Sequence, residues 1–225
     1  MKLGIVVPWR ARPTRVKAFG LTVNRLMDQF PNSTVYYADK ETKIFNVSGS
    51  RNQGCLSAIK DGCDVLLVVD ADTLLDKKAI EKAIAVVSKE DYVCMPYTFY
   101  NRLSEKVSTS LLKGELSFEQ LAVQGENSAW NHPGGAYVMS SSTFLRLNGW
   151  DERFVGWGYE DDAFSEAHIK ILGRGFVRVD GFALTLHHEH RDQDYIDVNS
   201  ERYKHYVDSP KKQVLGIIQG NMDVE

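Results

Sequence analysis

The sequence predicts an α/β protein, a three-layer α/β/α sandwich around a mostly parallel central sheet. Short apolar runs with strand character alternate with longer segments in which apolar residues recur at helical spacing. Residues 65–69 are an unbroken aliphatic run, which is typical of a parallel strand covered on both faces. A chain of 225 residues, 43% of them hydrophobic, is long enough to bury the core of one such domain.

The first hundred residues supply most of the alternation. The expected strands are residues 3–8, which end at a proline, and residues 34–39, 65–69 and 91–100. The expected helices are residues 14–30, 50–61 and 76–88. The first helix is expected because Val16, Phe19, Leu26 and Phe30 recur at helical spacing.

The second half is less regular. Residues 101–130 are polar, with a helix expected near LSFEQLAV (116–123) and a loop at QGENSAWNHPGG (124–135). This loop is either a lid or acceptor wall, or an ordinary surface excursion. A strand and a short helix are expected within residues 136–154, and a helix from Phe164 to Leu172. A strand-like segment over 175–190 and a helix over 198–207 complete the expected elements.

Composition excludes some classes of function. The net charge of -3 argues against a protein built mainly to hold nucleic acid, although Arg10, Arg12, Arg15 and Lys17 form a local basic segment. The three cysteines suit reduced, buried thiols better than a disulfide framework. No apolar segment is long enough for a membrane span, and the N-terminal run reads as a strand. We therefore expect a cytoplasmic protein.

The stretch FVGWGYEDDAF, residues 154–164, places three consecutive carboxylates, Glu160, Asp161 and Asp162, behind a Gly-Trp-Gly segment. Acidic side chains are favoured in the first turn of a helix, and this alone could explain the carboxylates. It does not explain Trp157 between two glycines, because glycine is used where the backbone must bend or approach another group closely. The segment is therefore a candidate for an aromatic lip over a carboxylate site.

A second candidate site follows the strand at residues 65–69. Ligands bind at the carboxyl ends of strands in open α/β sheets, and Asp70 and Asp72 stand at such an end. Two carboxylates at this spacing either share a divalent cation or cap a helix. His187, His188 and His190 follow another apolar run and favour the metal hypothesis, since imidazole is a common metal ligand.

Together these groups describe transfer from a nucleotide diphosphate. A cation held by Asp72 and a histidine would neutralise the leaving diphosphate, and one carboxylate of the trio would take the proton from an attacking hydroxyl. The other carboxylates would bind acceptor hydroxyls, while the tryptophan would exclude water. Two alternatives stay open: a metal-dependent phosphate-ester hydrolase or nucleotidyltransferase, and a non-catalytic module that binds a nucleotide sugar or glycan.

Three motifs in order carry a resemblance to known enzymes. VPWRARPTR resembles the nucleotide-binding start of the β-1,4-galactosyltransferases, and SRNQGCLSAIKDGCDVLLVVDADT resembles the helix and Asp-x-Asp strand of GT-A glycosyltransferases. NGWDERFVGWGYEDDAF is similar to a segment that those galactosyltransferases share with the catalytic domains of polypeptide N-acetylgalactosaminyltransferases. The resemblance implies a Rossmann-like GT-A fold in one domain, with a nucleotide-binding half (1–100), an acceptor and catalytic half (101–190) and a C-terminal extension (191–225).

The resemblance also implies roles for individual residues. The donor would be a nucleotide sugar, expected to be a UDP-sugar, with Mn²⁺ or Mg²⁺ as the cation. The residues implied to hold the donor are Pro8, Arg10, Arg12, Arg51, Asp70, Trp157 and Gly158. The implied metal ligands are Asp72, with Asp70 nearby, and His188 or His190. Asp161 would be the base of an inverting displacement, with Glu160 and Asp162 as acceptor or sugar contacts. From the residues alone, Glu160 and Asp161 cannot be ranked as the base.

The sequence also departs from the motif. Tyr159 stands where the galactosyltransferase motif Gly-Trp-Gly-Gly-Glu-Asp-Asp has the second of its two consecutive glycines. This change would stiffen the lip or narrow the donor pocket. The membrane anchor, stem and paired cysteines of the animal enzymes are not found, so the chain resembles a compact microbial or viral version. The acceptor is expected to be a glycan, a protein or another hydroxyl compound, a modified base of viral DNA included. The residues expected only to pack are Trp130, Trp150, Tyr195, Tyr203 and Tyr206.

Overall fold

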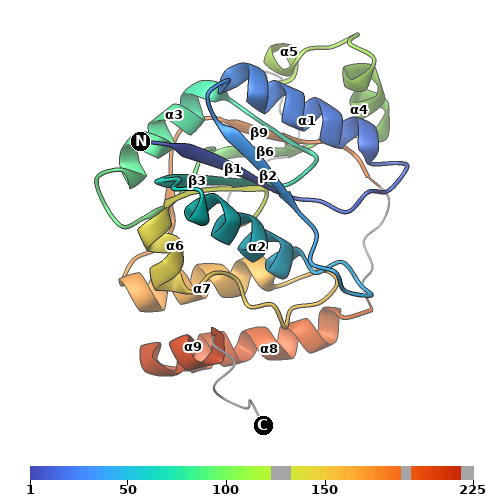
Figure 1. Cartoon of the computed structure of the whole chain (residues 1–225). Helices are drawn as coiled ribbons and strands as arrows, with labels where there is room; N and C mark the ends of the chain where they lie inside the picture. Colours follow the sequence, from blue (N-terminus) through green and yellow to red (C-terminus); the bar gives the residue numbers. More distant parts are fainter. Residues whose placement is uncertain (123–132, 189–193, 219–225) are drawn as a thin grey trace.

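A computed structural model of the chain describes residues 1–122, 133–188 and 194–218. Within them a larger and a smaller sheet lie between layers of helices (Figure 1). Figure 1 shows α1 and α3 on one side of the larger sheet and α2, α6 and α7 on the other. Helices α8 and α9 pack against α7 and add a further row of helices beyond it. The predicted α/β/α sandwich is confirmed, with this extra row outside it.

In the described residues the larger sheet has the strand order β2-β1-β3-β7-β5-β8. Its strands are β1 (Leu3–Pro8), β2 (Thr34–Ala38), β3 (Val65–Val69), β5 (Val93–Met95), β7 (Ala136–Ser140) and β8 (Val177–Arg178). Strand β7 runs antiparallel to both of its neighbours, β3 and β5, and the other pairs are parallel. The central sheet is therefore mostly parallel, as predicted. The antiparallel β7 brings its first residues to the edge at which β1 and β3 end.

A smaller sheet, in the order β4-β9-β6, was not predicted. Its strands are β4 (Thr73–Leu75), β6 (Phe99–Arg102) and β9 (Phe182–Thr185). The expectation of one strand over 91–100 and one over 175–190 was wrong, because each segment divides between the two sheets. Pro96, which has no N–H to donate to a ladder, separates β5 from β6. A bend at Asp180 separates β8 from β9, and the carbonyl of Gly181 accepts from the backbone N–H of Phe99.

The helices lie close to their predicted positions in the first hundred residues. The helices of the described residues are α1 (Val16–Gln29), α2 (Val47–Lys60), α3 (Lys77–Val87), α4 (Glu105–Leu112), α5 (Phe118–Ala122), α6 (Ser141–Leu147), α7 (Glu160–Leu172), α8 (Ile196–Asp208) and α9 (Lys211–Ile218). The description of 101–130 as irregular missed α4, which begins after Ser104. The Ser104 hydroxyl caps it by accepting from the backbone N–H of Val107.

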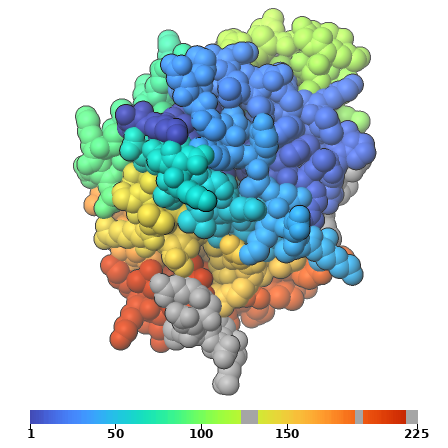
Figure 2. Space-filling view, in the orientation of Figure 1, coloured from blue at the N-terminus to red at the C-terminus, as the bar shows by residue number. Residues whose placement is uncertain are grey.

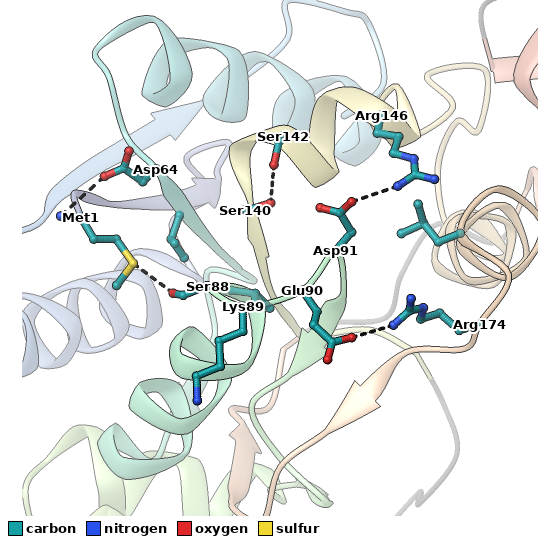
Figure 3. A pocket seen from close by; sticks show the side chains of 13 residues that line it. Met1, Asp64, Ser88, Lys89, Glu90, Asp91, Ser140, Ser142, Arg146 and Arg174 are labelled. Carbon is teal, nitrogen blue, oxygen red and sulfur yellow. Dashed lines mark hydrogen bonds and ion pairs between the residues drawn. The ribbon is translucent and has the colours of Figure 1, made fainter.

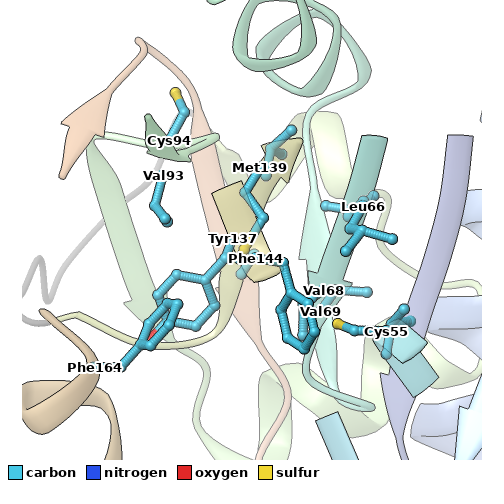
Figure 4. Packing of buried hydrophobic residues seen from close by; sticks show 14 of the residues in the cluster. Cys55, Leu66, Val68, Val69, Val93, Cys94, Tyr137, Met139, Phe144 and Phe164 are labelled. Carbon is cyan, nitrogen blue, oxygen red and sulfur yellow. The ribbon is translucent and has the colours of Figure 1, made fainter. Parts of the chain in front are cut away.

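The core lies between the larger sheet and its helices. Every residue of β3 is buried, and side chains of β7 pack against α6 and α7 (Figure 4). The rings of Tyr137 and Phe164 meet edge to face, and Trp150 stacks on Phe164 at a centroid distance of 4.0 Å. The packing role predicted for Trp150 is confirmed, since it is buried, whereas Trp130 lies outside the described residues. All three cysteines are buried, as predicted.

The C-terminal helices are attached through a polar network that includes the buried side chains of Asp151 and Tyr206. Tyr206 on α8 donates to Oδ2 of Asp151 at 2.9 Å, and Arg153 donates to both oxygens of the same carboxylate. Arg153 also reaches the carbonyl of Ile217 on α9 at 2.5 Å. Figure 2 shows the red C-terminal residues along the lower border of the molecule, next to the yellow and orange segments.

Among the described helices, none combines the length and apolar character that crossing a membrane requires.

Candidate active site

A cavity of about 1030 Å³ opens where β1 and β3 end and β7 begins. The predicted site residues that the structure describes all line it: Pro8, Arg10, Arg12, Arg51, Asp70, Asp72, Trp157, Gly158, Glu160, Asp161, Asp162 and His188. His190 lies outside the described residues. Residues from both halves of the chain therefore meet at one edge of the sheet, where ligands bind in open α/β folds.

Arg51 lies at the floor of this cavity. Its side chain is almost completely buried, with 2% of its surface exposed. Its Nη2 atom donates to Oδ1 of Asp70 at 2.9 Å, and its Nη1 atom donates to Oδ1 of Asp161 at 2.6 Å. The guanidinium thus joins the carboxylate after β3 to the carboxylate in the first turn of α7.

Asp161 has a second buried partner. The phenol of Tyr137, on β7, donates to the same Oδ1 atom at 2.7 Å. Gly134, with a φ of 140°, lies on the other side of the carboxylate, and a Cβ there would lie 3.0 Å from Oδ2 of Asp161. The carboxylate is therefore held through one oxygen, while the other lies beside a backbone position that carries no side chain. Asp161 lies in the first turn of α7, as expected for an acid at a helix start. It also forms an ion pair with Arg51.

Glu160 begins α7, and its Oε2 atom accepts from the backbone N–H of Gly158 at 3.1 Å. Burial raises the pKa of Glu160 to about 7, and the adjacent charge of Asp161 acts in the same direction. A carboxyl group with such a pKa exchanges protons near neutral pH. Two neighbouring acids in the first turn of α7 therefore lie in different environments. Asp161 is paired with the guanidinium of Arg51, whereas burial dominates the environment of Glu160.

The candidate metal ligands meet at another side of the cavity. Nε2 of His188 lies 3.6 Å from Oδ2 of Asp72, and both side chains are largely buried. The Nδ1 atom of His188 lies 3.1 Å from Nη2 of Arg15. Within the ranges that the structure describes, no group of three histidine, cysteine or acidic side chains is close enough to hold a metal ion. Asp70 forms its ion pair with Arg51.

The basic segment after β1 lies at the rim of the cavity. Arg10 forms a two-point ion pair with Asp39, with distances of 2.8 and 2.7 Å, and its guanidinium lies 5.4 Å from the centre of the Phe45 ring. Side chains that sequence reasoning did not assign to the site also line the cavity: Trp9, Lys43, Phe45, Tyr97, Tyr100 and Arg102. Each of these residues belongs to a loop or a short strand, so the sequence pattern gives no sign that its side chain reaches the site.

The backbone of the aromatic lip bends because three of its residues have left-handed conformations. Gly156 and Gly158 have φ values of 72° and 107°, and Tyr159 has a φ of 67°, which is strained for a residue with a side chain. The Tyr159 ring stacks on Tyr203 of α8 at a centroid distance of 5.6 Å. The buried amide of Asn199 donates to the carbonyl oxygens of Val155 and Trp157 at 2.9 and 3.3 Å. Helix α8 therefore supports the lip from behind.

A second cavity, of about 560 Å³, opens near the N-terminus and is lined by none of the predicted site residues (Figure 3). Both arginines that line it pair with acids of the same cavity, Arg146 with Asp91 at 2.9 Å and Arg174 with Glu90 at 3.0 Å. The larger cavity is therefore the better candidate for an active site.

Comparisons with known proteins find galactosyltransferases among the chains similar to this one. Residues 117–191 match the family described as the N-terminal domain of galactosyltransferase. A xylosylprotein 4-beta-galactosyltransferase of Caenorhabditis elegans is 22% identical over 228 residues, covering 96% of this chain and 69% of that protein. The catalytic domain of Drosophila beta1,4galactosyltransferase 7, in complex with xylobiose, has a TM-score of 0.64 and 18% identity over 90% of this chain and 79% of that chain.

Other solved structures extend the likeness. A mutant of the same Drosophila enzyme, in complex with manganese, UDP-Gal and xylobiose, has a TM-score of 0.54 and 18% identity over 79% of this chain and 64% of that chain. GalNAc-T7 with UDP, GalNAc and Mn²⁺ has a TM-score of 0.55 and 12% identity over 90% of this chain and 47% of that chain. The chain is a glycosyltransferase with the GT-A fold. The resemblance carried by the three sequence motifs is thus confirmed.

The fold of this glycosyltransferase explains how its site is assembled. The motifs after β1 and β3 reach the cavity because parallel strands end at one edge of the sheet. The carboxylates of α7 reach it because the turn before that helix bends through three residues with positive φ. Tyr137 was missed by sequence reasoning, since a tyrosine in a buried strand gives no signal that its hydroxyl reaches a carboxylate.

Proposed function

We propose that this glycosyltransferase moves a sugar from a UDP-sugar to an acceptor hydroxyl, with inversion and with Asp161 as the general base. The observation that carries the proposal is that Asp161, Asp72 and His188 line one cavity of about 1030 Å³. The manganese, UDP-Gal, UDP and GalNAc bound in structures of similar fold support the class of donor and of cation.

Asp72 and His188 fit a divalent cation, Mn²⁺ or Mg²⁺. Their facing atoms are a carboxylate oxygen and an imidazole nitrogen 3.6 Å apart, and both types of atom are ligands of such ions. When bound, the cation supplies Lewis-acid stabilisation of the charge on the leaving diphosphate. Arg10, Arg12 and Arg15 line the same cavity and would donate to phosphate oxygens.

Asp161 would take the acceptor proton through Oδ2, because its Oδ1 atom already accepts from Arg51 and Tyr137. The acceptor oxygen then forms its bond to the anomeric carbon as the bond to the diphosphate breaks. Attack from the side opposite the leaving group inverts that carbon. Trp157 would cover the sugar and keep water, a competing acceptor, away from the donor.

A thermal-shift screen tests the donor class, because a ligand that binds only the folded state raises the melting temperature. We expect a manganese-dependent shift with UDP and with at least one of UDP-glucose, UDP-galactose and their N-acetylated forms, and none with GDP. A steady-state assay of UDP release, with and without xylobiose as a probe acceptor, then tests transfer. UMP release would favour a phosphate-ester hydrolase, and binding without any turnover would favour a non-catalytic module.

A further inference from the structure

Arg51 connects two parts of the cavity that come from distant parts of the chain. The residue lies on α2, and its two Nη atoms bind Asp70, at the end of β3, and Asp161, on α7, at 2.9 and 2.6 Å. On the proposed function, Asp161 activates the acceptor, and Asp70 lies two residues before the proposed metal ligand Asp72. A single planar group therefore links the carboxylate at the end of β3 to the proposed base.

The surroundings of Arg51 hold this group rigidly. The guanidinium carbon lies 5.3 Å from the centre of the Trp150 ring and 5.7 Å from that of Tyr137. Asn52, the next residue on α2, binds the backbone of Trp150 as both donor and acceptor, at 2.8 and 2.9 Å. Burial alone would lower the pKa of Arg51, but the charges of Asp161 and Asp70 outweigh burial and raise it well above its ordinary value. The group stays charged and fixed in place.

The contacts also distinguish the two oxygens of Asp161. Oδ1 accepts from Arg51 and from Tyr137, at 2.6 and 2.7 Å. Oδ2 lies beside Gly134, where an added Cβ would come within 3.0 Å of it. Gly134 itself lines the cavity. The two donors thus orient the carboxylate so that one oxygen is held and the other borders the cavity.

We propose that Arg51 is a positioning residue that keeps Asp70 and Asp161 at a fixed separation and, together with Tyr137, orients Oδ2 of Asp161 toward the acceptor. This inference rests on the proposed function. It differs from the expectation from sequence, in which Arg51 contacts the donor itself.

The test begins with Arg51→Lys, which keeps the charge but replaces the planar fork with a single ammonium group. Calorimetric titration with UDP and Mn²⁺ should give a Kd within about threefold of wild type, since binding energies of unaffected contacts are retained. The kcat for UDP release from UDP-Gal, with xylobiose as the probe acceptor, should fall about 100-fold, because a misplacement of about 1 Å has such an effect. Tyr137→Phe, which removes only one donor to Oδ1, should lower kcat less, again without changing Kd. Thermal melts of both variants verify that they are folded.

A double variant separates positioning from donor contact. If Arg51 acts through Asp161, Arg51→Lys combined with Asp161→Asn should be no slower than Asp161→Asn alone. A multiplicative loss in the double variant, a weakened UDP·Mn²⁺ complex in Arg51→Lys, or unchanged kcat in Arg51→Lys overturns the inference and leaves the proposed function standing. A wild-type protein that neither binds nor turns over any UDP-sugar overturns the proposed function, and the inference falls with it.

Discussion

The Nε2 atom of His188 lies 3.6 Å from Oδ2 of Asp72, although the two residues are 116 positions apart in the sequence. The small sheet brings them together, because β4 follows Asp72, β9 precedes His188, and Thr73 pairs with Thr185. The backbone N–H of Leu186 also donates to the carbonyl of Asp72 at 2.9 Å. The pairing of β4 with β9 therefore sets the spacing of the two proposed metal ligands.

This spacing predicts the effect of removing either ligand. Asp72→Ala should abolish manganese-dependent UDP binding, and His188→Ala should weaken Mn²⁺ affinity tenfold or more, since even outer-shell changes cost about 10- to 100-fold. His187→Ala is the matched control, because His187 is exposed and does not line the cavity. Mn²⁺ titration followed by electron paramagnetic resonance measures the affinity. Equal losses in the His187 and His188 variants would count against the assignment.

Asp161→Asn should separate binding from transfer. The amide keeps the size of the carboxylate but cannot take a proton, so kcat should fall by about 10²- to 10⁴-fold. The Kd for UDP with Mn²⁺ should change little, because Asp161 is assigned to the acceptor side. Asp162→Asn is the control for loss of a charge in the same helical turn, and its kcat should fall less. An Asp161→Asn protein as active as wild type would transfer the role of base to Glu160.

The sequence was most informative where one short segment carries the whole signal. The strand at residues 65–69 was located correctly, and Asp70 and Asp72 after it line the cavity, because a buried aliphatic run ending in aspartate depends on no distant residue. The lip and the carboxylates of α7 were also identified from one segment, 154–164. What the motif did not reveal is that Tyr159 adopts a left-handed backbone conformation.

The ion pair of Arg51 with Asp161 could not be predicted from the sequence. Arg51 and Asp161 are 110 positions apart and meet only because α2 and α7 lie on the same side of the sheet. The small sheet was missed for the same physical reason: β4, β6 and β9 have three or four residues each, too few for a periodic signal. Their pairing is defined by tertiary contacts, and with it the distance between Asp72 and His188.

Asn199→Ala should weaken the support of the lip. The Asn199 amide is 2% exposed and binds two carbonyl oxygens of the lip, at Val155 and Trp157. Loss of its buried hydrogen bonds should cost about 1–3 kcal/mol of unfolding free energy. Because the Trp157 segment then loses its fixed position, KM for the UDP-sugar should rise, and a larger share of turnover should be hydrolysis. Urea unfolding and the ratio of free sugar to product measure both effects. A destabilised variant with an unchanged product ratio would show that Asn199 serves stability alone.

His168 predicts a pH dependence of stability. Its Nε2 atom accepts from the backbone N–H of Val93 at 3.1 Å, and Nδ1 lies 2.7 Å from the carbonyl of Arg174. The ring is therefore neutral, and burial lowers its pKa to about 4. The unfolded chain, with a histidine pKa of about 6.5, binds more protons between these values. The contribution of His168 is thus complete above about pH 6.5 and is lost as pH falls toward 4, by about 2 kcal/mol at pH 5.

Urea unfolding at pH 7.5 and at pH 5 measures this contribution. His168→Gln, whose amide can accept from one backbone group and donate to the other, should lose less stability between the two pH values than wild type. The difference between the proteins isolates His168 from carboxylates such as Glu160 that titrate in the same range. His187→Gln is the exposed control and should follow wild type. Equal slopes in His168→Gln and wild type would contradict the prediction.

Variants of Tyr159 allow the cost of its left-handed backbone conformation to be compared with the stabilisation from its stacking on Tyr203. A side chain at a φ of 67° costs about 1–2 kcal/mol, and stacking on Tyr203 returns about 0.5–1.5 kcal/mol. Tyr159→Gly removes both terms, whereas Tyr159→Ala removes the stacking and keeps the strain. The glycine variant should therefore be more stable than the alanine variant by about 1 kcal/mol in urea unfolding.

The same pair of variants tests whether Tyr159 narrows the donor pocket. Tyr159 is one of the residues that line the cavity, together with Trp157 and Asp162, and both variants remove its ring. The kcat/KM for UDP-GalNAc relative to UDP-Gal should rise about tenfold in both, since one pocket contact separates similar substrates by about this factor. A rise in the glycine variant alone would mean that backbone flexibility of the lip, rather than the volume of the ring, controls which donor enters. An unchanged ratio in both would place the ring away from the donor sugar.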